Sequence, residues 1–184
     1  MKKLSISAAA LCAALLATAG LASAQSTQNL PIPGAAVASD VPNAKELPDP
    51  NVTYKVVFDI AKAAAKPDEV NPMLLAMARY INTLAKFGVP ADHRKIAAVF
   101  HQGGTSAILN NEAFQARYDG RSNPNIAMIQ SLAKAGVDFR VCGQSILANK
   151  IDQKSIQPEI EVDLWALTTI VSLETRGYIR IGGE

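Results

Sequence analysis

The sequence predicts a three-layer α/β/α domain built on a mostly parallel sheet of about five strands. Two observations lead to this prediction. Short runs of β-branched and aromatic residues alternate along the chain with segments whose apolar residues recur at helical spacing. Strands joined through helices need crossover connections, and such connections produce parallel sheets. The length of 184 residues suits one domain of this kind.

Five segments have the composition of strands. Residues 54–58 form the first, and residues 95–100 form the second, which is almost continuously apolar, as expected of a strand covered on both faces. The other three are shorter and comprise residues 138–141, 160–162 and 178–181.

Three segments have the periodicity of helices. The first begins at Asn71-Pro72, a capping residue followed by a first-turn proline. The second is expected to open in the same way at Asn123-Pro124. The third spans residues 164–176. Its residues expected to face inward are Leu167, Ile170 and Val171.

The N-terminal segment 1–24 has the features of a secretory signal peptide. Lys2 and Lys3 precede an apolar stretch, and residues 22–24 form a small-residue cleavage site. The mature protein is therefore expected to be exported to the periplasm, with no integral membrane segment after cleavage. Removal of the two lysines leaves 16 basic and 16 acidic residues. This balance argues against a nucleic-acid-binding protein, which would need an excess of positive charge.

Residues 25–51 contain five of the ten prolines in the chain. Proline fixes φ and lacks an N–H group, so this stretch suits neither a helix nor a central strand. We expect an arm or linker that either wraps the domain or remains a disordered leader.

Cys142 is the only thiol expected in the mature chain, because Cys12 lies in the signal segment. In an oxidising compartment it must be buried, reactive or paired with another molecule. A helix capped by Ser145 and running over residues 146–149 would favour the thiolate. A buried cysteine that packs as a small apolar residue is the competing interpretation.

Three polar side chains follow the first three predicted strands, namely Asp59, His101 and Cys142. Ligands of open parallel sheets bind at the carboxyl ends of strands, so these residues are candidates for one site. His101 is either a partner of the thiol or bonded to its own loop. Asp59 either orients His101 or caps a loop, and capping is favoured. No cluster has the spacing of a metal site, so neither a metal nor a cofactor is predicted.

The segments together resemble the DsrE/DsrF-like family, in particular its exported single-domain members. The resemblance covers about residues 52–182, and we assign residues 52–184 to this domain. The stretches that resemble the family are 56–59, 78–82, 99–101, 110–114, 123–125, 136–137, 141–144 and 177–179. The resemblance implies a parallel α/β/α sheet and assembly into trimers or hexamers. Family members that act in sulfur relay hold sulfur as a persulfide on a cysteine, and Cys142 is the matching position.

The leading hypothesis is a periplasmic carrier of sulfane sulfur, and so a sulfurtransferase, with Cys142 and His101 as catalytic residues. Gly143 and Gln144 would supply donors around the sulfur, and Gly103 and Asp59 would complete the substrate site. Its partners would be sulfur donors and acceptor thiols or proteins. The alternative is a non-catalytic oligomeric assembly protein with a buried structural cysteine. Thiol–disulfide exchange is weaker because the chain lacks a Cys-x-x-Cys motif.

Overall fold

The structure is a computed structural model that describes residues 30–182. The predicted signal peptide and its expected cleavage site, which would place the mature start near Gln25, lie outside these residues. No helix within residues 30–182 is long and apolar enough to cross a membrane.

A five-stranded sheet forms the centre of the domain. Its strands are β1 (Tyr54–Ile60), β2 (Arg94–Phe100), β3 (Asp138–Cys142), β4 (Ile160–Asp163) and β5 (Ile179–Gly182). All neighbouring strands are parallel, and their order across the sheet is β4-β3-β2-β1-β5. The predicted three-layer α/β/α fold and the five predicted strands are thereby confirmed.

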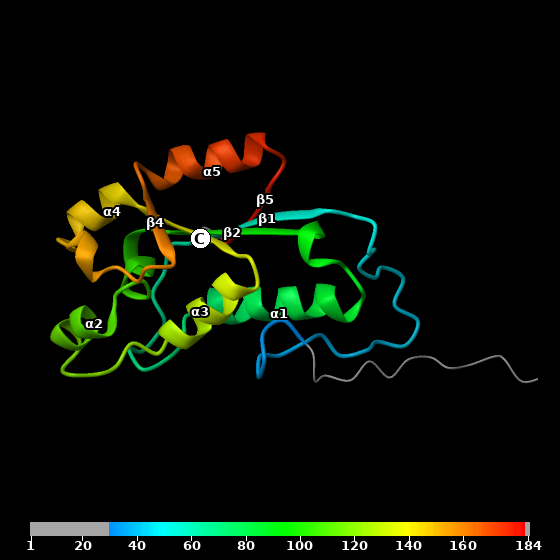
Figure 1. Ribbon diagram of the computed structural model, residues 1–184, viewed down its shortest axis with the longest axis horizontal. Helices are drawn as coiled ribbons and strands as arrows, with labels where there is room; N and C mark the ends of the chain where they lie inside the picture. The colour runs from blue at the N-terminus through cyan, green and yellow to red at the C-terminus, as the bar shows by residue number, and fades with distance from the viewer. Residues whose placement is uncertain (1–29, 183–184) are drawn as a thin grey trace, which may run out of the picture.

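Helices cover both faces of this sheet. They are α1 (Pro72–Lys86), α2 (Asn111–Arg117), α3 (Ile126–Lys134), α4 (Gly143–Ala148) and α5 (Ala166–Thr175). Helices α1 and α3 lie under one face and α5 lies over the other (Figure 1). Short 3₁₀ helices complete the fold, at η2 (Ala91–His93), η3 (Gln102–Ser106) and η4 (Gln153–Ser155). Helix α2 had not been predicted, because its seven residues are too few to show a periodicity.

The first helix begins as predicted, whereas the second begins later. Asn71 caps α1 by accepting a hydrogen bond from the Met73 N–H, and Pro72 occupies the first turn. Helix α3 starts only at Ile126. Asn123 is buried instead, and its amide donates to the carbonyl oxygens of Ala107 and Leu109. The helix therefore starts two residues later than predicted, although Asn123 Oδ1 still accepts from the Asn125 N–H at 2.9 Å, as a capping side chain would.

The inward face of α5 also differs from the prediction. Ile170 is buried as expected, together with Ala166 and Leu173. Leu167 and Val171, however, are 50% and 48% exposed. The helix is apolar on two sides, so helical periodicity could not identify which side contacts the sheet.

The two faces of the sheet have cores of very different size. The face under α1 and α3, here called the broad face, holds a cluster of 23 buried apolar residues that includes Phe58, Phe100 and Phe139. The face under α5, here called the Cys142 face, holds a cluster of seven. Cys142 belongs to this smaller cluster, together with Val57 of β1 and Val99 of β2.

Part of the proline-rich arm lies against α1. Ile32 is buried in the broad-face core, and its backbone N–H and carbonyl both bond to the side chain of Asn82. Further along, the Ala38 N–H donates to Thr83 Oγ1. Residues 30–40 therefore extend the hydrophobic core of their own domain.

Candidate active site at Cys142

Strand order and side-chain alternation place the three candidate residues at one corner of the sheet. β1, β2 and β3 are adjacent, and Phe100 pairs with Val141, so His101 and Cys142 follow at the same level. Asp59 pairs with Val99, two residues before His101. Because side chains alternate along a strand, all three lie on the Cys142 face. The three strands that precede these residues are neighbours, as one shared site requires.

The Cys142 thiol is surrounded by hydrogen-bond donors. Cys142 occupies the position before α4, and the backbone N–H groups of Gln144, Ser145 and Ala166, with the Ser145 hydroxyl, lie near enough to its sulfur to stabilise a thiolate. Burial raises the pKa of this thiol, but the hydrogen bonds outweigh burial and the pKa is lowered overall. Two helices, α4 and α5, begin at these donors, and their N-terminal ends favour a negative charge. The site is thus suited to a thiolate.

A histidine–carboxylate pair and an arginine line the same pocket as the thiol. His101 Nε2 is 2.5 Å from Asp59 Oδ1, and since a carboxylate oxygen only accepts, Nε2 is the donor. Arg180 of β5 approaches the second carboxylate oxygen at 3.6 Å. Asp59 is 5% exposed, so both partners contact a buried carboxylate. The favoured prediction that Asp59 caps a loop was wrong, and the other interpretation, that Asp59 orients His101, describes the structure.

These groups line one pocket of about 440 Å³. Cys142, His101 and Asp59 form its floor, and Trp165 and Leu167 are half-exposed members of its wall. Cys142 itself is only 2% exposed. The sulfur therefore lies at the bottom of a pocket and not on the outer surface.

Four further lining residues connect the pocket to its surroundings. Ser145 Oγ accepts from the Gln102 N–H, which links α4 to the start of η3. The side-chain amide of Gln144, predicted to contact the sulfur, donates to the Leu164 carbonyl instead.

Sequence reasoning missed Arg180 and gave Ser145 only a capping role. The polar position of Arg180 within an otherwise apolar strand was the available signal.

Two glycines predicted to contact substrate have a different role. A Cβ on Gly143 would lie 2.8 Å from the Asp163 carbonyl oxygen, and one on Gly103 would lie 3.1 Å from the Ala63 backbone nitrogen. Each glycine thus allows two backbone segments to pack closely. Neither lines the Cys142 pocket. Contact of Gly103 and Gly143 with substrate stays a prediction.

The arrangement provides a stabilised thiolate next to a histidine–carboxylate pair. Such a thiolate is a nucleophile, and the imidazole can give or take a proton at its remaining nitrogen. Cys142 is the free cysteine of the described residues and has no disulfide partner among them. The chemistry available is therefore attack by one sulfur atom on an external electrophile.

Comparison with known proteins identifies the class of this fold and site. The family model described as DsrE/DsrF-like matches residues 54–181. The chain therefore belongs to the DsrE/DsrF-like family, and this membership suggests a role related to sulfur relay.

A solved structure with the same fold is among those similar to this chain. It is MTH1491, a protein of unknown function from Methanobacterium thermoautotrophicum, with a TM-score of 0.51 and 20% sequence identity. The match covers 70% of this chain and 97% of MTH1491. No curated protein matches the chain.

Proposed function

We propose that this protein is a periplasmic carrier that accepts sulfane sulfur on Cys142 and passes it to an acceptor thiol. The observation that supports this proposal most directly is the set of donors around the thiol, from the N-terminal ends of α4 and α5. A structural cysteine would need no such donors, because a neutral thiol packs as an apolar group.

The transfer involves two substitutions at sulfur and no net oxidation. The Cys142 thiolate attacks the outer sulfur of a donor persulfide, R–S–SH. A new S–S bond forms to Cys142, the donor's S–S bond breaks, and the donor leaves as the thiolate R–S⁻. An acceptor thiolate then attacks the outer sulfur held on Cys142, and Cys142 leaves as a thiolate again. Charge and electrons balance in both steps.

His101 and its partners supply the proton transfers. With Nε2 held by Asp59, the His101 ring keeps a fixed orientation in the pocket, and its other nitrogen is the one left for the reactants. That nitrogen takes the proton of an arriving thiol and returns it to the departing one. Arg180, 44% exposed at the pocket, holds Asp59 from the other side and so keeps the carboxylate in place. Asp59 acts through His101 and is a positioning residue.

The test is mass spectrometry of the mature chain after incubation with glutathione persulfide, without reductant. Loading adds one sulfur atom, about 32 Da, to the peptide that contains Cys142. Cys142→Ser gains no such mass, and addition of a thiol acceptor removes it from the wild type. An unchanged mass on wild-type Cys142, under conditions where a small free thiol becomes loaded, would contradict the proposal.

Segment 1–24 supports the proposed location. Cells expressing the full chain would release it with the periplasmic fraction, and its N-terminus would lie at Gln25. A chain that retains Met1 or Lys2 would contradict export.

We also propose that the protein forms a homo-oligomer, a trimer or hexamer, through the outer side of α5. The support is a group of exposed apolar residues around α5, here called the α5 rim: Leu147, Leu164, Trp165, Leu167 and Val171. Such a surface is typical of an interface, and the balanced net charge leaves little repulsion between copies.

Sedimentation tests this assembly. The wild type sediments as a trimer or hexamer at micromolar concentration, and a Leu167→Lys/Val171→Lys double variant as a monomer. Ser172→Lys, a matched change at an exposed polar position of the same helix, keeps the assembly. A monomeric wild type would contradict the proposal. The same result would remove the support for the alternative function, a non-catalytic assembly protein.

A further inference from the structure

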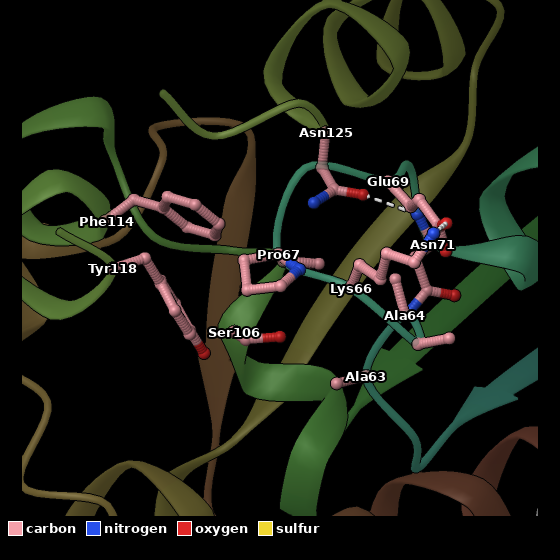
Figure 2. A pocket seen from close by; sticks show the side chains of 12 residues that line it. Ala63, Ala64, Lys66, Pro67, Glu69, Asn71, Ser106, Phe114, Tyr118 and Asn125 are labelled. Carbon is pink, nitrogen blue, oxygen red and sulfur yellow. Dashed lines mark hydrogen bonds and ion pairs between the residues drawn. The ribbon is translucent and has the colours of Figure 1, made fainter. Parts of the chain in front are cut away.

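A second cavity lies on the broad-face side of the sheet, at the same carboxyl end as Cys142. Its volume is about 160 Å³, and it is enclosed by the β1–α1 loop, η3 and α2. It has no residue in common with the Cys142 pocket. Figure 2 shows this cavity and the side chains that line it.

Rings form two opposite walls of the cavity. Phe114 and Tyr118 pack together at 4.4 Å between ring centroids and make one wall. The Pro67 ring lies across from them (Figure 2). A flat aromatic ring fits such a space, because aromatic rings interact favourably with one another in tilted and offset geometries.

Polar groups lie at two ends of the same space. Asn125 is 4% exposed and points its amide toward the cavity (Figure 2). Its Oδ1 accepts from the Asn71 N–H at 2.8 Å, and its Nδ2 donates to Asn123 Oδ1 at 2.9 Å. An amide nitrogen has two N–H groups, so one remains for an acceptor in the cavity.

Ser106 supplies the opposite kind of group at the other end. Its hydroxyl donates to the Gly103 carbonyl at 3.1 Å, so the oxygen keeps lone pairs that can accept from a ligand. The charges nearest the opening cancel, because Lys66 and Glu69 form an ion pair at 3.3 Å. The cavity therefore suits a neutral molecule and not an ion.

We propose that this cavity binds a small, neutral, planar aromatic molecule with a hydrogen-bond acceptor at one end and a donor at the other. The ring lies between Pro67 and the Phe114–Tyr118 wall, the acceptor faces Asn125 and the donor faces Ser106. The volume suits on the order of ten non-hydrogen atoms. Binding here is independent of the Cys142 thiol, since the two pockets lie on opposite faces of the sheet.

The probe is 4-hydroxybenzamide, which has a carbonyl and a hydroxyl at opposite ends of a benzene ring. Titration of the ¹⁵N-labelled full chain by NMR would shift the side-chain amide signals of Asn125, with a Kd of about 0.1–1 mM. Cyclohexanecarboxamide, which lacks the flat ring, and the anion 4-hydroxybenzoate should each bind at least tenfold more weakly.

Variants separate this site from the rest of the molecule. Tyr118→Leu should weaken binding of 4-hydroxybenzamide at least tenfold, and Ser106→Ala about three- to tenfold. Tyr178→Leu, a matched change at a half-buried tyrosine on the Cys142 face, should leave binding unchanged, as should Cys142→Ser. No shift of the Asn125 signals in the wild type, or equal weakening by Tyr178→Leu, would overturn the proposal. Equal affinity for the anion or for the cyclohexane compound would overturn the ligand class.

Discussion

The two faces of the sheet divide stability and chemistry between them. The broad face buries 23 apolar residues under α1, α3 and the arm, whereas the Cys142 face buries seven under a single helix. The thin cover of α5 leaves room for a pocket above Cys142, His101 and Asp59. The reactive groups therefore lie on the face with the smaller buried core. Substitutions on the two faces should differ in their effects on stability and on sulfur transfer.

The largest expected effect is on the broad face. Leu74→Ala removes a fully buried side chain from the larger cluster and should lower the free energy of unfolding by about 3–5 kcal/mol. Leu173→Ala is the matched change on the Cys142 face, where the buried cluster is much smaller, and should lower it by about 2–3 kcal/mol. Urea denaturation measures both values. Equal losses would remove the distinction between the faces.

The next effect concerns chemistry on the Cys142 face. His101→Ala should slow sulfur transfer from Cys142 to an acceptor thiol about 100-fold near neutral pH, because it removes the proton-transfer group. At a pH where all thiols are ionised, the variant should approach the wild-type rate. Stopped-flow measurement of persulfide transfer across pH provides both values. An identical loss at every pH would indicate damaged packing.

A smaller effect is expected where the arm joins the broad face. Asn82→Ala leaves the Ile32 N–H and carbonyl without their partners and should lower the free energy of unfolding by about 1–3 kcal/mol. The arm should also become sensitive to limited proteolysis near residues 30–40. Thr83→Ala, which removes one bond to Ala38, serves as the milder control. Sulfur transfer should be unchanged in both variants, since the arm lies on the face away from Cys142.

The smallest effect concerns the pKa of the Cys142 thiol. Ser145→Ala removes the hydroxyl that bonds to the Cys142 sulfur, so the pKa of the thiol should rise. Alkylation by iodoacetamide at pH 7 should slow about tenfold, the effect of one charge-assisted hydrogen bond. Ser106→Ala, on the other side of η3, is the matched control and should leave the rate unchanged. An equal response of the two variants would mean that Ser145 acts only through packing.

The sequence predicts the strands better than it predicts where the helices begin and which of their residues contact the sheet. Both the near-continuous apolar run of β2 and the parallel order follow from hydrophobicity and connection length. The inward side of α5 does not, because Leu167 and Val171 match the apolar pattern as well as Ile170 does. The later start of α3, after a turn at residues 124–125, is not apparent either, because Asn123-Pro124 has the composition of a helix opening.

For the site, strand ends predict which residues meet but not what each one does. Asp59, His101 and Cys142 come together because β1, β2 and β3 are neighbours. The choice between a capping and an orienting Asp59 depends on His101 and Arg180, which approach from two other strands. Gly143 was assigned to the ligand because its sequence context gives no sign of the Asp163 backbone against it.

The pH dependence of Cys142 alkylation, measured together with the stability of Cys142→Ser, tests most directly whether the Cys142 face is built for a thiolate. Because the pKa of Cys142 is lowered in the folded chain, the iodoacetamide rate should rise with a midpoint below that of a free cysteine, about 8.5. A group with a lowered pKa stabilises the fold fully above its unfolded pKa and loses this contribution as pH falls through the folded pKa. The stability difference between the wild type and Cys142→Ser should therefore be small in acid and grow as pH rises toward 8.5 or so. Slow alkylation at every pH, together with a large and pH-independent loss of stability in Cys142→Ser, would instead identify Cys142 as a packing residue and contradict the account.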